Sequence, residues 1–166
     1  MLYQDYLNDF ELAKNQLNQS LLNEKQLLVW VGFKLDSVVL KLYKKSWTND
    51  EFNPLDASSR IFFSVWLNNV SIAEEKVYYN IHALKLRELK RFNIKSRDFA
   101  ESFRKDFKNH QADWENVSVD FGPLTLMEGF MKLNPRSVTD AIVELANNFL
   151  KIENLIDDTL HSFKKN

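Results

Sequence analysis

Apolar residues recur at helical spacing through the first 46 residues. The first set predicts an amphipathic helix over residues 2–19, with spacings of three and four: Tyr3, Tyr6, Phe10, Ala13 and Leu17. A second set predicts a helix over residues 24–46: Leu27, Leu28, Val31, Leu35, Val38, Val39 and Leu42. A hairpin within residues 27–45 is the alternative, because Val29–Val31 and Val38–Leu40 also suit strands. The length of the helical pattern favours the helix.

The middle of the chain changes to a strand pattern after a turn-rich loop over residues 47–59. Residues 61–67 predict a strand with alternating faces. One face carries Ile61, Phe63, Val65 and Leu67, and the other carries Phe62, Ser64 and Trp66, so both faces are largely apolar. That indicates either a central strand covered on both sides or an exposed sheet face used for binding. A second strand is predicted from residue 76 to about residue 86. The link of eight residues between them favours an antiparallel pair.

The last third predicts two more helices. Ser96 is expected to cap a helix over residues 97–110, which carries Phe99, Phe103 and Phe107 on one face. Residues 117–121 read as a short strand, and residues 124–133 read as a strand or an irregular segment. Asn134-Pro135 is expected to begin a long helix over residues 135–164. Its apolar seam repeats by four and three: Val138, Ile142, Leu145, Phe149, Ile152, Ile156, Thr159 and Phe163.

These elements predict one α+β domain over residues 1–166. It comprises a helical part (1–46), the loop (47–59), and a region of sheet and helices (60–166). The expected core is an antiparallel sheet of about four strands, packed by the N-terminal helices and the long C-terminal helix. The C-terminal seam has two interpretations, which are packing on the first helix of the same chain and a homodimer through this helix.

The amino-acid composition limits the kinds of site that this chain can form. The 166 residues include no cysteine, which excludes disulfides, thiolate nucleophiles and cysteine metal sites. No signal peptide and no membrane-spanning apolar run are visible, so we expect a cytoplasmic protein without a membrane partner. His82, His110 and His161 lie in separate predicted elements without ligand spacing, and no nucleotide-binding glycine motif occurs. We therefore expect no cofactor.

One short motif suggests an enzyme. Glu88-Leu89-Lys90 resembles the E-x-K core of the PD-(D/E)xK nucleases, followed as in that family by a predicted helix and a strand. The resemblance covers only this fragment, and it implies magnesium-dependent hydrolysis of a phosphodiester with Asp56 as a second metal ligand. The acid that the family carries on the preceding strand is missing here, since residues 60–73 contain no acid.

The charge layout favours a different function. The chain has a net charge of -1, but residues 85–108 hold nine basic and four acidic residues. Arg87, Lys90, Arg91 and Arg97 are expected to form an anion-binding site between a strand end and a helix start. The sequence therefore predicts a non-enzymatic interaction or regulatory domain whose partner is an acidic protein surface or nucleic acid. The alternatives are the hydrolase and a structural subunit that assembles through the C-terminal helix.

Overall fold

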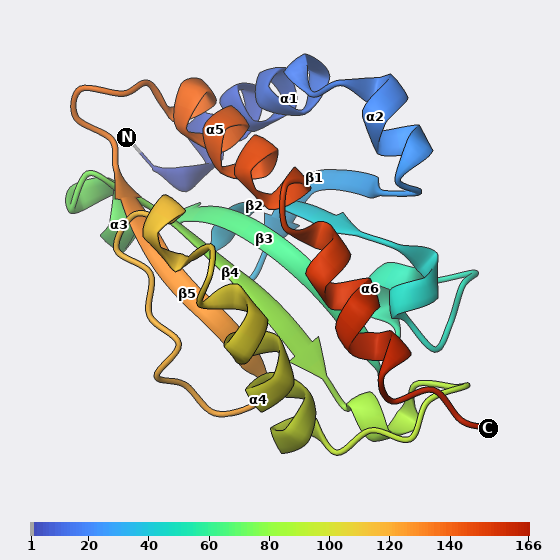
Figure 1. The fold of residues 1–166 in the computed structure, drawn as a ribbon. Helices are drawn as coiled ribbons and strands as arrows, with labels where there is room; N and C mark the ends of the chain where they lie inside the picture. The colour runs from blue at the N-terminus through green and yellow to red at the C-terminus, as the bar shows by residue number, and fades with distance from the viewer. Residues whose placement is uncertain (1) are drawn as a thin grey trace.

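A single antiparallel sheet forms the centre of the computed structural model, which describes residues 2–166 (Figure 1). Its five strands follow one another in chain order, and each pairs antiparallel with the next. They are β1 (Leu28–Lys34), β2 (Ser37–Tyr43), β3 (Arg60–Asn68), β4 (Lys76–Leu84) and β5 (Thr125–Lys132). The α+β class with an antiparallel sheet is confirmed, with one strand more than the sequence predicted.

Helices cover one face of this sheet, as Figure 1 shows for α1, α4, α5 and α6. The helices are α1 (Leu7–Gln16), α2 (Gln19–Glu24), α3 (Asn69–Ala73), α4 (Ser96–Phe107), α5 (Val138–Leu150) and α6 (Glu153–His161). The short α3 lies in the connection from β3 to β4. No helix within residues 2–166 combines the length and the apolar character needed to cross a bilayer.

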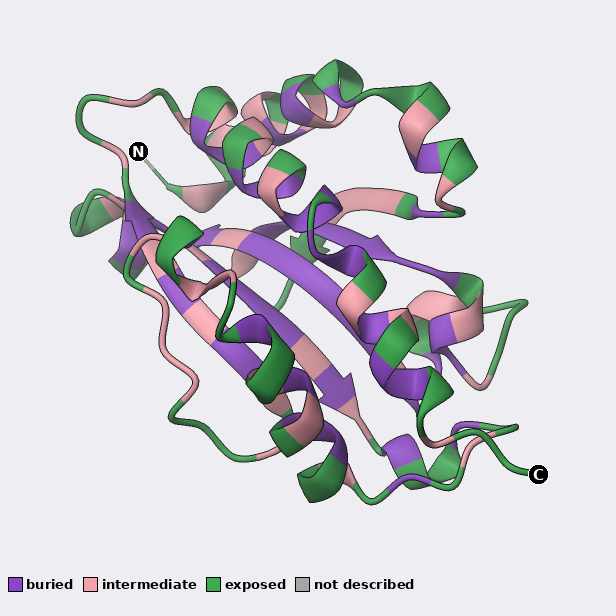
Figure 2. Cartoon of the chain, viewed as in Figure 1, coloured by how far each residue is buried: buried purple, intermediate pink, exposed green. Residues whose placement is uncertain are grey.

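The core lies between the sheet and these helices. The helix-facing side chains of β3 are Ile61, Phe63, Val65 and Leu67, and none of them is exposed. Phe149 of α5 stacks on Phe63 with ring centres 4.5 Å apart. Figure 2 shows the same division, with buried residues on the sheet side of each helix and exposed residues on the outer turns. The alternation predicted for this strand is confirmed.

The helix predicted over residues 24–46 is wrong, and the hairpin alternative is the structure. β1 and β2 pair along their full lengths and are joined by a turn at Leu35 and Asp36. In β2, Val38, Leu40 and Leu42 face the helices while Val39 and Lys41 face the other side. Because apolar residues occupy both faces of these strands, their positions also match helical spacing by coincidence.

The N-terminal helix is interrupted rather than continuous. A 3₁₀ turn (Tyr3–Tyr6) precedes α1, which ends at Gln16. Asn18 then caps α2, because its side-chain oxygen accepts a hydrogen bond from the backbone N–H of Leu21 at 3.1 Å. An Asn at this position competes with continuation of the preceding helix.

Two predictions for the last third also differ from the structure. Ser96 is the first residue of α4 rather than its cap, but Phe99, Phe103 and Phe107 share a buried face as predicted. Residues 117–121 form no strand beyond a single bridge from Ser118 to β5, which itself occupies the segment that the sequence left open.

The C-terminal helix is two helices. Ser137 caps α5, so the helix begins after Asn134-Pro135, and a break at Lys151 and Ile152 separates α5 from α6. The predicted seam from Ile142 to Thr159 is buried within the chain, and α5 packs on α1 while α6 packs on α4. The two terminal helical regions therefore pack together inside one chain. A homodimer through this seam would have to expose the core.

Candidate functional site

The second face of the sheet is the most distinctive surface of the protein. In the described chain, this open face is crossed at one end by the loop that contains Pro54 and Leu55, and it has no helix packed over its centre. Because antiparallel partners point to the same side, the register arranges its side chains in rows across the strands. One row is Trp30, Lys41, Ser64, Asn80 and Glu128, and the next is Gly32, Val39, Trp66, Tyr78 and Phe130.

Aromatic rings pack on one another across the open face. Phe62 stacks on His82 with ring centres 5.3 Å apart, and Trp66 stacks on Tyr78 at 5.6 Å. Gly32 gives the Trp30 indole room to lie against the strand, because a Cβ at this glycine would come within 2.4 Å of the ring. The strands thus support an aromatic surface that no helix uses for packing.

A chain of hydrogen bonds joins polar side chains of the open face. The Ser64 hydroxyl donates to the Asn80 side-chain oxygen at 2.6 Å. The Asn80 amide nitrogen contacts Nε2 of His82 at 2.7 Å and Glu128 at 3.3 Å. Burial lowers the pKa of His82, helped by the charges of Lys41 and Arg60, while a hydrogen bond to the backbone of Leu124 opposes the shift. We therefore assign a neutral ring whose Nε2 accepts from Asn80.

Among the described residues, the Lys41 ammonium of this row has neither an ion-pair partner nor a hydrogen-bond partner. The residue is only 5% exposed, and its ammonium lies 4.4 Å from the ring centre of Phe62 and 5.9 Å from that of Trp30. Within residues 2–166, no carboxylate lies within 4.0 Å of it and no hydrogen bond joins it. Burial, then the charges of Arg60 and Lys34, lower its pKa to about 8, while Asp56 opposes the shift.

Lys44 shows how differently this chain treats another buried lysine. Its ammonium lies 2.8 Å from Glu153 and 2.6 Å from Asp157, both of α6. Burial alone would lower its pKa, but these hydrogen-bonded carboxylates raise it. The helix side of the sheet thus satisfies its buried cation, whereas the open face does not.

Lys41 lines a pocket of about 260 Å³ on the open face. Its other lining residues include Phe62, Ser64, Trp66, Asn80 and His82. The β1–β2 turn forms part of the rim, where Leu35 is 96% exposed and Lys34 lies 3.8 Å from Asp56 of the crossing loop. A pocket with aromatic walls, an unpaired cation and a few polar groups has the composition of a small-ligand site.

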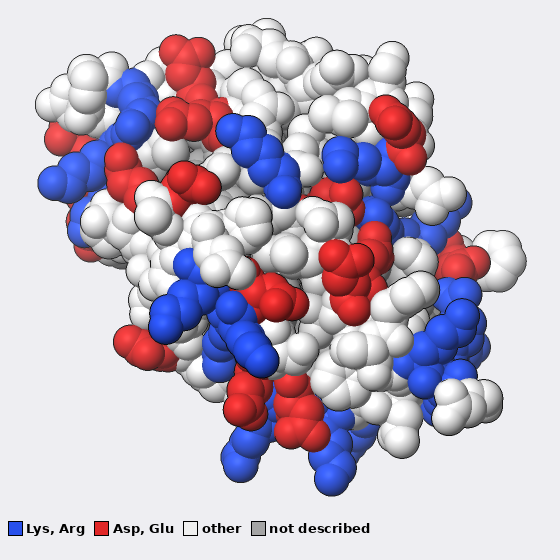
Figure 3. Space-filling view, in the orientation of Figure 1, with Lys and Arg blue, Asp and Glu red and all other residues white. Residues whose placement is uncertain are grey.

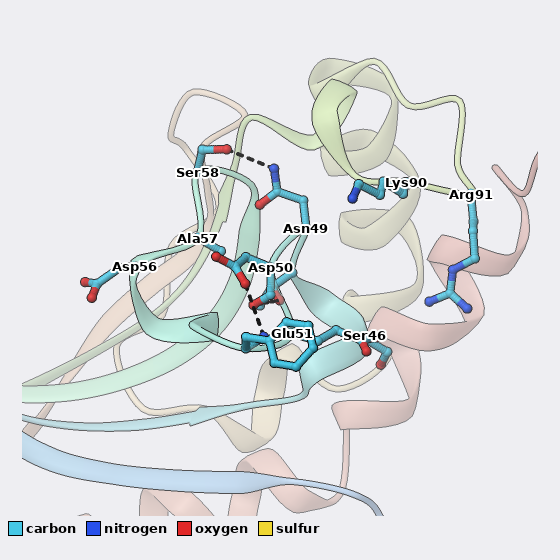
Figure 4. A pocket seen from close by; sticks show the side chains of 11 residues that line it. Ser46, Asn49, Asp50, Glu51, Asp56, Ala57, Ser58, Lys90 and Arg91 are labelled. Atoms are coloured by element: carbon cyan, nitrogen blue, oxygen red, sulfur yellow. Dashed lines mark hydrogen bonds between the residues drawn. The ribbon is translucent and has the colours of Figure 1, made fainter.

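The predicted basic site is only partly assembled. Lys90 and Arg91 line a second hollow of about 660 Å³, together with Asp50, Glu51 and Asp56 (Figure 4). Arg87 and Arg97 are exposed and do not line it. Within the described residues, none of the four has a carboxylate within 4.0 Å. Figure 3 shows basic and acidic groups interleaved over the helix-covered face.

The nuclease-like pair has a different setting from the one that the resemblance implies. Glu88 lies on a 3₁₀ turn (Leu86–Glu88) after β4, and its carboxylate accepts a hydrogen bond from Ser58 at 3.1 Å. Residues 117–121, which the resemblance requires as a strand after the helix, form only a single bridge through Ser118. Within residues 2–166, no group of three or more His, Asp or Glu side chains is arranged to hold a metal ion.

Comparison with known proteins adds no relative. The chain matches no family model, no curated protein and no solved structure. The sequence had pointed to the open face through the two apolar sides of β3, but it did not indicate Lys41 or Asn80. Lys41 lies within the helix predicted over residues 24–46, and only the pairing of β2, β3 and β4 brings it into one row with Ser64 and Asn80.

Proposed function

We propose that this protein is a non-enzymatic binding module that takes a small planar anion in the open-face pocket. The observation that carries the proposal is Lys41, a buried ammonium without a carboxylate or hydrogen-bond partner among the described residues. A buried charge is costly unless it is paired. An anionic ligand at this position would supply the missing partner, and the nearby Arg60 and Lys34 would add to the attraction.

The walls favour a ligand with a flat ring. Phe62, Trp66 and His82 present ring systems to the pocket, and rings of this kind stack on planar groups. The volume of about 260 Å³ lies just under the roughly 300–1,000 Å³ usual for ligand pockets. A single-ring carboxylate such as benzoate fits these features.

Tryptophan signals give a direct test. Trp30 and Trp66 lie on the open face, whereas Trp47 and Trp114 are buried on the helix side. Titration of nitrogen-15-labelled protein with benzoate at pH 7 should shift the indole resonances of the first two and leave the other two in place. Benzamide, which has the same shape without the charge, should bind at least tenfold more weakly.

Two variants with the same substitution locate the site. Lys41→Met should weaken benzoate binding at least tenfold, and Lys90→Met in the other hollow should leave it unchanged. Affinity should also fall as pH rises through about 8, because Lys41 loses its charge there. Equal binding of benzoate and benzamide, or unchanged binding by Lys41→Met, would refute the proposal.

The basic segment supports a second candidate, binding of an acidic protein surface or nucleic acid. The observation that favours it is the absence of carboxylates within 4.0 Å of Arg87, Lys90, Arg91 and Arg97 among the described residues. Such binding should weaken steeply with salt, because each neutralised phosphate releases counterions. Single-stranded and duplex DNA at low and moderate salt are the probes, and no binding even at low salt would remove the nucleic-acid version.

A further inference from the structure

The Lys41 amine has the setting of a nucleophile as well as that of a cation. It is not held in an ion pair or a hydrogen bond within the described chain, and it reaches a pocket that a small molecule can enter. Lys44, by contrast, is held between two carboxylates. An amine becomes reactive toward carbonyl compounds when it lies in an apolar site or beside another cation, and Lys41 has both surroundings.

We propose that Lys41 forms a reversible imine with small aromatic aldehydes that enter the open-face pocket. This activity goes beyond non-covalent anion binding and does not depend on it, because a neutral aldehyde has the same reactive carbon. The two ideas share a pocket, but they can fail separately.

The reaction needs no oxidant or reductant. The lone pair of the neutral Nζ attacks the carbonyl carbon, the carbonyl oxygen takes up a proton, and the nitrogen loses one, which gives a carbinolamine. The nitrogen lone pair then forms the C=N bond as the hydroxyl group is protonated and leaves as water, and the resulting iminium nitrogen loses its proton to solvent. One amine and one aldehyde thus give one imine and one water, and hydrolysis reverses the step.

The surroundings of Lys41 favour the neutral form of its amine. With a pKa of about 8, roughly 10% of Lys41 is neutral at pH 7, against roughly 0.03% of a lysine at 10.5. Arg60 and Lys34 act in this direction, Asp56 acts against it, and His82 is the other titratable group of the pocket. The Phe62 ring beneath the amine provides a stacking surface for the aldehyde ring.

Reductive trapping tests the proposal. The protein is treated at pH 7 with a limiting amount of benzaldehyde and cyanoborohydride, which reduces the imine to a stable secondary amine. The adduct at Lys41 should form at least tenfold faster than at any of the other 15 lysines. Because trypsin does not cleave at the modified residue, mass spectrometry should find the adduct on a peptide spanning residues 35–44.

Three controls separate the outcomes. Urea-unfolded protein should lose the preference for Lys41. If benzoate binds the same pocket, an excess of it should slow the labelling of folded protein. Lys41→Arg keeps a positive charge but removes the reactive amine, so benzoate should still shift the Trp66 indole while trapping on residues 35–44 disappears. Labelling of Lys41 at the rate of the exposed lysines in folded protein overturns the inference, and that result stands whether or not the variant folds. It leaves anion binding intact if the benzoate shifts remain.

Discussion

Replacing Lys41 by Met should make the protein more stable while weakening the proposed benzoate binding. The substitution keeps an unbranched side chain of similar length and takes away a charge that is 5% exposed and unpaired in the described chain. A fall in pKa from 10.5 to about 8 corresponds to roughly 3 kcal/mol against the charged form at neutral pH. The lost attraction to the Phe62 ring, about 0.5–2 kcal/mol, offsets part of this gain.

The net expectation is a gain of about 2 kcal/mol, which for a domain of this size raises the melting temperature by about 4–8 °C. Lys44→Met is the matched control, because it removes a buried lysine from the same segment with the opposite environment. It leaves Glu153, which is 4% exposed, without one of its two lysine partners, and it should destabilise the protein. The cost should stay below the roughly 3–5 kcal/mol of a fully buried pair, because Asp157 is partly exposed.

Urea denaturation followed by circular dichroism at pH 7 measures both variants. The pH dependence of the free energy of unfolding gives a second test. Between pH 8 and 10.5 the unfolded chain holds more protons on Lys41 than the folded chain, so this residue makes stability rise with pH in that window. The advantage of Lys41→Met over the parent should therefore shrink as pH rises, while the tyrosines contribute equally to both proteins. A destabilised Lys41→Met variant, or a constant difference across this window, would show that the ammonium has a partner in the folded state.

Three further experiments test other parts of the structure. Phe149→Ala should cost about 3–5 kcal/mol in urea denaturation because it empties a fully buried site, whereas Phe130→Ala on the open face should cost less than half as much. Gly32→Ala should displace the adjacent indole, shift its resonance and weaken benzoate binding, with the fold retained by circular dichroism. Arg87→Gln combined with Arg91→Gln should lower DNA binding at low salt without changing the melting temperature, and unfolding of this double variant would instead show that these arginines support the fold.

The sequence pattern predicted an element correctly where one of its faces is buried and the other is exposed to solvent. The α4 helix is such a case, since Phe99, Phe103 and Phe107 lie inward and charged residues lie outward. The pattern failed in the β1–β2 hairpin, where Trp30 and Val39 face the open side while Val38 and Leu40 face the core. With apolar residues on both faces, the period of two that marks a strand is lost.

The open-face pocket was beyond prediction for a different reason. Its residues come from β2, β3 and β4, and only the register brings Lys41, Ser64 and Asn80 into one row. A shift of one residue in either pairing would turn these side chains to the core. The sequence carried a weaker sign of the site in Phe62, Ser64 and Trp66, which gave β3 a second side too apolar for an ordinary solvated sheet face.

Lys41 and Lys44, two buried lysines in or directly after β2, show that the two faces of the sheet differ in how they surround a buried charge. On the helix side, Lys44 and Lys25 contact Glu153, and the Trp47 indole donates to Asp157, so the charges there hold α6 in place. On the open side, Lys41 has aromatic neighbours and nearby cations, but no carboxylate of the described residues lies within 4.0 Å of its ammonium. If folding alone had shaped this position, an apolar residue would serve better, because an unpaired buried charge reduces stability. The anion that we propose for the open-face pocket would offset this cost by pairing with the ammonium.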